Sequence, residues 1–255
     1  MRHFWLLSNF ISREIRSRYL GSVTGLLWAL IQPLALLAIY AFVFSTIFQV
    51  RFPELGGHRF LSFVAVALWP WQIFSEGIQR GMAAIQANSG LIQKVAFPRE
   101  ILVYANVIAA SVIHLAGYAA VLLVLILIGE TITPSGFVLA LLSLLSLWLI
   151  TAALALVLAA LQVFLRDVEH VIVPLLMILF YATPILYPLS LVPANLHWAY
   201  QLNPIAYLMG RLRDALLHAG QLAVNDAWML LGVLVAFSLA LLFFRRLEPF
   251  FEDFL

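Results

Sequence analysis

Residues that could carry out catalytic chemistry are few in this chain of 255 residues, and their spacing fits no common catalytic site. Asp167 and Glu169 form the only close acidic pair outside the C-terminal tail, and a lone D-x-E in a short turn is weak grounds for acid–base or metal-assisted catalysis. The single lysine, Lys94, is not part of a G-K-[ST] sequence, so the chain has no P-loop to cradle ATP. The absence of cysteine excludes thiolate metal sites and cysteine nucleophiles. We expect no catalytic residue, no metal ligand and no cofactor bound by this chain.

A basic segment from Asn88 to Glu100, N-S-G-L-I-Q-K-V-A-F-P-R-E, lies between two long apolar stretches. Asn88 is typical of a turn or helix cap, and Pro98 biases Phe97 away from helix, so a new helix should begin near Arg99. The spacing alone fits two interpretations. One is a loop whose positive charge holds the orientation of the chain, and the other is a short helix that docks into a groove of another protein.

Aromatic side chains are the other set with a chemical use, because flat apolar rings with polar tips can stack on sugar faces. Tryptophan and tyrosine also gather at membrane interfaces without any such role. Both interpretations therefore stay open for each ring. The candidate path for a glycan comprises Trp69, Trp71, Phe74, Tyr104, Tyr181, Tyr187, Trp198 and Tyr207, with Phe180 and Tyr200 of the same kind.

Composition identifies the class of protein that must position these residues. Hydrophobic residues make up 64% of the chain and charged residues 10%, whereas soluble domains carry about 25% charge. A soluble fold of this length could not bury so much apolar surface, so the chain is predicted to be an all-α integral membrane protein. The net charge of +2 is spread between apolar segments, which argues against a nucleic-acid partner.

Residues 1–19 are predicted to form an amphipathic helix on the membrane surface. Phe4, Leu7 and Ile11 share one helical face, with Arg13 and Arg16 roughly opposite. The apolar run is broken by polar residues and has no small-residue cleavage site before the arginines, unlike a signal peptide.

Six spans are predicted by apolar length, and prolines break the segment after the fifth. Because irregular backbone inside a membrane is tolerated only against protein or a water-filled path, that segment is expected to form short re-entrant helices on the external side. The predicted spans are 25–48, 60–82, 101–128, 137–165, 171–188 and 227–244, with a cytoplasmic loop at 84–100 and the external segment at 189–210.

Polar residues near the spans give further expectations. Glu76 is expected near the cytoplasmic interface, paired with Arg80 one turn away, and His114 is expected to make a hydrogen bond between helices. Arg211 and Arg213 are expected to return to water. Ten lysines and arginines fall on the side of the termini against four on the other, so the positive-inside rule places both termini in the cytoplasm.

The pattern N-x-x-L-I-x-K-x-x-F-P-R-E resembles the first cytoplasmic loop of the membrane subunits of polysaccharide ABC exporters, which carry O-antigen, capsule or teichoic acid. Residues Arg13 to Pro33 resemble the first segment of that family. Arg166-Asp167-Val168, Tyr181-Ala182-Thr183-Pro184-Ile185 and Asn203-Pro204 resemble its later motifs, in the same order. The resemblance covers nearly the whole chain.

This resemblance implies a homodimer in the bacterial inner membrane with two cytoplasmic ATP-binding subunits, which hold ATP and Mg. Lipid-linked polysaccharide, with O-antigen favoured, would enter from the membrane lipids near Arg13, Arg16 and Arg18, which could hold a pyrophosphate. Residues 189–210 would act as an external gate. The residues implied in coupling to the ATPase are Asn88, Leu91, Ile92, Lys94, Phe97, Pro98, Arg99 and Glu100.

Other readings carry less support from the residues. Capsule and teichoic-acid exporters are close branches, and an ABC exporter for drugs or other lipids is disfavoured by the F-P-R-E loop. An ion-coupled carrier is disfavoured because Glu76 is the only carboxylate placed within a span. A membrane glycosyltransferase would need a catalytic base and metal-binding carboxylates, for which only Asp167 and Glu169 are available.

Overall fold

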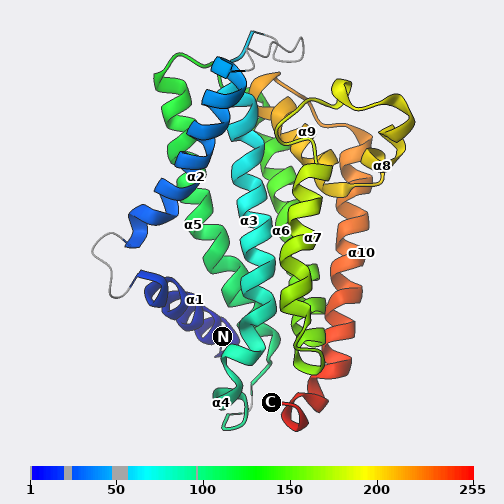
Figure 1. Ribbon diagram of the computed structural model, residues 1–255. Coiled ribbons are helices and arrows are strands. Elements are labelled where there is room, and N and C mark those ends of the chain that lie inside the picture. Colours follow the sequence, from blue (N-terminus) through cyan, green and yellow to red (C-terminus); the bar gives the residue numbers. More distant parts are fainter. Residues whose placement is uncertain (1, 20–24, 48–56, 96) are drawn as a thin grey trace.

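The computed structural model describes residues 2–19, 25–47, 57–95 and 97–255, and this part of the chain is helical without any strand (Figure 1). The first half comprises α1 (Arg2–Tyr19), α2 (Gly25–Ala41), the π-helix η1 (Phe42–Ile47), α3 (Phe60–Ala87), α4 (Ser89–Ile92) and α5 (Glu100–Leu127). The second half comprises η3 (Pro134–Gly136), α6 (Phe137–Phe164), α7 (Val168–Ala182), η4 (Leu189–Leu191), η5 (Ala194–Leu196), α8 (His197–Gln201), α9 (Pro204–Leu217), α10 (Val224–Leu247) and η6 (Glu248–Asp253).

The helix α3 is the centre of the bundle and packs chiefly against α5 and α6. Two glycines one turn apart, Gly77 and Gly81, let α6 approach closely. A Cβ atom at Gly77 would lie 2.6 Å from Cγ2 of Thr151, and one at Gly81 would lie 2.6 Å from Cβ of Ala155. Small residues at a helix contact are the usual means of tight packing in membranes, where no hydrophobic force draws helices together.

Both ends of the chain lie at the same end of the bundle, beside α4 (Figure 1). We call this the termini end, and the other the opposite end. The helices α2, α3, α5, α6, α7 and α10 run between the two ends, whereas α1 lies across the termini end and packs against α5 (Figure 1). The amphipathic helix predicted at residues 1–19 is thus present as α1, and its place on a membrane surface stays a prediction.

Four helices within the described residues are long and apolar enough to cross a membrane: α3, α5, the continuous η3–α6 and α10. Their bounds agree closely with the spans predicted at 60–82, 101–128, 137–165 and 227–244, although α3 continues to Ala87. The helix α7, with 15 residues, is about 22 Å long by its rise per residue, less than the roughly 30 Å of a hydrocarbon core. The six-span topology therefore stays a prediction.

The segment predicted to be broken after the fifth span does consist of short helices. After α7 the chain forms η4, η5 and α8 before α9 begins at Pro204. The side chain of Asn203 caps α9 by accepting hydrogen bonds from the amides of Ile205 and Ala206, and it donates to the hydroxyl of Thr183 just after α7, 3.1 Å away. Two separate motifs of the sequence, Y-A-T-P-I and N-P, therefore meet here.

Arg213 contradicts the expectation that it returns to water. Its side chain is buried against α3, its guanidinium lies 3.6 Å from the ring centre of Phe63, and it donates to the carbonyls of Phe63, Pro184 and Ile185 at 2.6 to 3.0 Å. The break after α7 leaves carbonyls without helical partners, and a guanidinium with five donors can satisfy several at once. Arg211 does not return to water either, since its side chain is 15% exposed and pairs with Asp226 and Asp214.

Candidate functional site

The loop between α3 and α5 contains a single helical turn, α4, in place of a longer amphipathic helix. Ile92 is buried and anchors this turn in an apolar cluster formed by α3, α5, α6 and the C-terminal segment. Gln93, Lys94 and Val95 are exposed. The outward surface of the loop is therefore short and centred on Lys94.

The helix α1 holds the loop from one side. The ring of Phe97 packs 5.7 Å from that of Phe10, and the guanidinium of Arg13 donates to the side-chain oxygen of Asn88 at 2.5 Å. Of the three arginines predicted to bind a pyrophosphate, Arg13 is thus engaged with the loop and Arg16 is exposed. The side chain of Arg18 lies outside the described residues.

The C-terminal segment, residues 245–255, holds the loop from the other side. The amide of Arg99 donates to the Glu248 carboxylate at 3.0 Å, and its guanidinium donates to the Glu248 carbonyl and the Glu252 carboxylate. Glu100, which is buried, accepts two hydrogen bonds from Arg245 at 2.8 and 3.1 Å. Arg99 and Glu100, both predicted to contact an ATPase, therefore bind their own chain.

A groove of about 450 Å³ separates the loop from the C-terminal segment. Its lining combines apolar and charged groups: Ile92, Gln93, Lys94, Val95, Phe97, Arg99, Glu248, Pro249 and Glu252. Among the predicted coupling residues, Lys94 is the one whose side chain is exposed to solvent. Five others are partly exposed: Asn88, Leu91, Phe97, Pro98 and Arg99. The exposed tip of the loop, on the rim of this groove, is the surface on which a partner could bear.

A second cleft, of about 270 Å³, lies between α2, α3 and α7 in the middle of the bundle. It brings together Trp71 and Tyr181 of the predicted path with Tyr40 and Phe180, and the rings of Trp71 and Phe180 are 5.4 Å apart. Amide and hydroxyl groups of Gln72, Ser75 and Gln79 also line the cleft. The rest of the lining is apolar: Leu36, Val173, Leu176 and Met177. Aromatic faces beside uncharged hydrogen-bonding groups suit a sugar, because the rings stack while the amides donate and accept.

Other rings of the predicted path lie elsewhere. Trp69 and Phe74 are fully buried in the bundle and reach no surface in this conformation. Tyr104 packs against Phe237 of α10, with ring centres 6.2 Å apart. In the segment after α7, the hydroxyl of Tyr187 contacts that of Tyr200 at 2.9 Å, and Trp198 is exposed.

Tyr207 belongs to a polar cluster at the opposite end. It donates to Asp226 at 2.7 Å, and Arg211 donates to the same carboxylate at 2.7 and 2.8 Å. Burial and the hydrogen bond to Asp226 raise the pKa of Tyr207 to about 12, so its phenol stays neutral and remains a donor. This cluster ties α9 to the first turn of α10.

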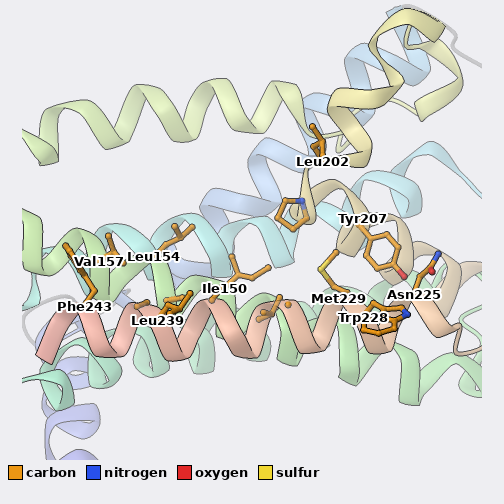
Figure 2. A pocket seen from close by; sticks show the side chains of 16 residues that line it. Ile150, Leu154, Val157, Leu202, Tyr207, Asn225, Trp228, Met229, Leu239 and Phe243 are labelled. Carbon is orange, nitrogen blue, oxygen red and sulfur yellow. The ribbon is translucent and has the colours of Figure 1, made fainter. Parts of the chain in front are cut away.

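A third groove, of about 1070 Å³, lies between α6, α10 and the start of α9 (Figure 2). Figure 2 shows Leu154, Val157 and Phe243 toward one end and Tyr207, Asn225 and Trp228 toward the other. Its lining is almost wholly apolar, so it offers little to a sugar.

The expected pairing of Glu76 with Arg80 and the interhelical role of His114 are both confirmed. Glu76 accepts from Arg80 and contacts Nε2 of His114 on α5, each at 2.5 Å. Arg80 also lies 3.8 Å from Glu14 of α1. A chain of polar contacts thus connects α1 with α3 and α5, and its links between different helices are not predicted by any spacing in the sequence.

Comparison with known proteins identifies the family. The model of the ABC-2 type transporter family matches residues 6–217. The chain belongs to the ABC-2 type transporter family. Members of this family are the membrane permease subunits of ABC transporters, so the chain is a multi-pass membrane protein of that kind.

Curated relatives of this ABC-2 chain span most of its length. It is 29% identical over 253 residues to the O-antigen export system permease protein RfbA of Myxococcus xanthus, covering 97% of this chain and 95% of the relative. It is 28% identical over 211 residues to the protein of the same name from Klebsiella pneumoniae, covering 83% and 80%. It is 27% identical over 206 residues to the polysialic acid transport protein KpsM of Escherichia coli, covering 80% and 78%.

Proposed function

We propose that this protein is the permease subunit of an ATP-driven exporter that moves lipid-linked polysaccharide, most closely of the O-antigen kind, across the bacterial inner membrane. The observation that carries the proposal is the match to O-antigen export permeases over nearly the full chain. A capsule exporter is the second candidate, because the polysialic acid transport protein is also similar. Two copies of the chain would pair and work with two ATP-binding subunits that hold ATP and Mg.

The exposed tip of the loop, Gln93 to Val95 on the rim of the groove next to the C-terminal segment, is where we place the ATP-binding subunit. The loop tip is exposed at the termini end, and its base is held by α1 and by the C-terminal segment. A subunit that presses on Lys94 and Val95 would therefore push on α3 and α5 without first deforming the loop. ATP would bind more tightly when the membrane domain is in one of its two states, and it would drive export by favouring that state.

The aromatic cleft between α2, α3 and α7 is where we place the glycan path. The cleft contains rings, amides and hydroxyls, and no charged side chain is among the described residues that line it. A neutral polar lining of this kind lets sugars slide past without a deep binding minimum. The segment from 189 to 210 would close the path on the external side.

Reversing the charge at the loop tip tests the docking surface. Lys94→Glu replaces the one lysine of the chain, on the rim of the groove, with an acidic residue. We expect the ATP-binding subunit to bind this variant about tenfold more weakly than the unaltered chain at low salt, and the difference to be smaller at high salt. The measurement is co-purification and binding affinity in detergent. Arg246→Glu makes the same change on an exposed side chain of α10 and should bind normally.

The complex of the unaltered chain with its ATP-binding subunit tests the proposed function itself. ATP turnover by the reconstituted complex should respond to lipid-linked polysaccharide. Failure of the unaltered chain to bind any ATP-binding subunit would contradict the proposed function. Equal binding by Lys94→Glu and the unaltered chain would contradict only the placement of the docking surface.

A further inference from the structure

The C-terminal segment, residues 245–255, contacts two distant parts of the termini end. One part is the loop after α3, through the ion pairs with Arg99 and Glu100 described above. The other is the C-terminal end of α6, at Phe164, just before the turn to α7. Figure 1 shows this segment beside both the α4 loop and the lower end of α6 and α7.

Contacts on the loop side are charged and partly or wholly buried. Glu100 is 8% exposed and pairs with Arg245, and Arg99 is 13% exposed and pairs with Glu252. Separating either pair would leave a shielded charge without its partner, which costs much more than losing a pair on the open surface. The loop and the C-terminal segment are therefore expected to move together.

Contacts on the other side are aromatic. The ring of Phe164, the last residue of α6, lies 4.8 Å from that of Phe254 and 6.0 Å from that of Phe251. Phe251 is fully buried and packs edge-on to Phe244 of α10 at 5.4 Å. Aromatic rings in edge-to-face contact hold a defined geometry, so a displacement of the segment would displace the end of α6.

We propose that the C-terminal segment is a transmission element, which carries movement of the α3–α5 loop to the turn between α6 and α7. The helix α7 leads from this turn along the aromatic cleft to the segment at 189–210. The ATP-binding subunit would thus act on both walls of the path from a single docking surface. This inference rests on the proposed function and adds to it the route by which ATP would be coupled to export.

The test separates transmission from docking. Glu252→Arg places a repelling charge opposite Arg99. Because the side chain of Glu252 is 60% exposed, the fold should persist. A single symmetrical peak in size-exclusion chromatography would show this. We expect this variant to bind its ATP-binding subunit normally and to hydrolyse ATP, while export of lipid-linked polysaccharide per ATP falls about tenfold, within the usual range of coupling energies.

Two further variants serve as controls. Asp253→Arg makes the same charge change one residue later, on an exposed side chain that takes part in none of the contacts described above, and should export normally. The double variant Arg99→Glu with Glu252→Arg restores opposite charges and should recover most of the lost export, which a merely misfolded tail could not do.

Each result has a distinct meaning. Export by Glu252→Arg equal to that of Asp253→Arg would overturn the proposal. Loss of the ATP-binding subunit from Glu252→Arg would also overturn it, because the segment would then be part of the docking surface. If the unaltered chain itself binds no ATP-binding subunit, the proposed function fails instead.

Discussion

Arg213 satisfies three backbone carbonyls from two different parts of the chain. Its hydrogen bonds go to Phe63 of α3 and to Pro184 and Ile185 after α7, and the ring of Phe63 covers its guanidinium. A buried carbonyl without a donor costs about 1–3 kcal/mol, so one side chain removes several such costs. Arg213 therefore fixes the place where the chain leaves α7 for the short helices that follow.

Replacing Arg213 tests this role. Arg213→Met keeps much of the length but leaves the three carbonyls without their donor, so we expect a loss of about 3 kcal/mol of stability. Arg213→Lys should lose less, because an ammonium can still donate to some of them. Thermal unfolding in detergent provides the measurement. Arg166→Met removes an exposed arginine and should leave the melting temperature unchanged; an equal drop in both would contradict the assignment.

Residues of this kind mark the limit of prediction from sequence. Glu76 and Arg80 are four apart in one helix, so their pairing could be predicted from helix geometry. Arg99 and Glu252 are separated by 153 positions, and Arg213 and Phe63 by 150. No local pattern connects such residues, because the contact depends on how whole helices pack.

Among the helices, α7 stands apart because most of its side chains are exposed and Leu176 is its one buried residue. Its apolar character could be predicted from composition, but its bounds could not: the predicted span is 171–188, whereas the helix runs from Val168 to Ala182. The loose packing of α7 could not be predicted, because an apolar sequence looks the same whether the helix faces lipid, protein or a glycan path. The close contact of α3 with α6 has a signal in the sequence, the G-x-x-x-G pattern from Gly77 to Gly81. The spans are predicted from apolar length alone, without this pattern.

The exposed ring of Tyr181 on α7 allows a test of the aromatic cleft. Tyr181→Ala should slow export about fivefold, the effect of about 1 kcal/mol of lost stacking, while ATP-binding subunit association stays normal. Tyr181→Trp keeps an aromatic face and should retain export. Trp228→Ala removes an equally exposed ring from the large groove in Figure 2 and should have little effect. Similar rates for Tyr181→Ala and Trp228→Ala would count against the path.

For the molecule as a whole, the arrangement of its ends bears on topology. Both termini and the α4 loop lie at one end of the bundle, whereas η3 and α9 lie at the other (Figure 1). The shared position of the two ends suggests that both lie on one side of the membrane, and the excess of lysine and arginine at the termini end favours the cytoplasmic side. The overall helical class and the family could be predicted from the sequence, and the comparisons confirm the family.

Cysteine labelling checks this topology directly, because the chain has no cysteine of its own. Ser135→Cys lies in η3 at the opposite end, and Gln93→Cys lies at the loop tip, both at exposed positions. We expect an impermeant thiol reagent to label Ser135→Cys in intact spheroplasts and Gln93→Cys only after lysis. The reverse pattern would place the termini outside the cell membrane.

The pairing of the loop with the C-terminal segment also bears on how the chain is made. Arg99 and Glu100 are synthesised about 145 to 153 residues before the partners that neutralise them. At about 5–20 residues per second, a ribosome takes on the order of ten seconds to supply those partners. Until then the loop carries its charges unpaired, and a product that stops before Arg245 never pairs them. The last helix to emerge therefore completes the site, so that only full-length chains present a finished loop.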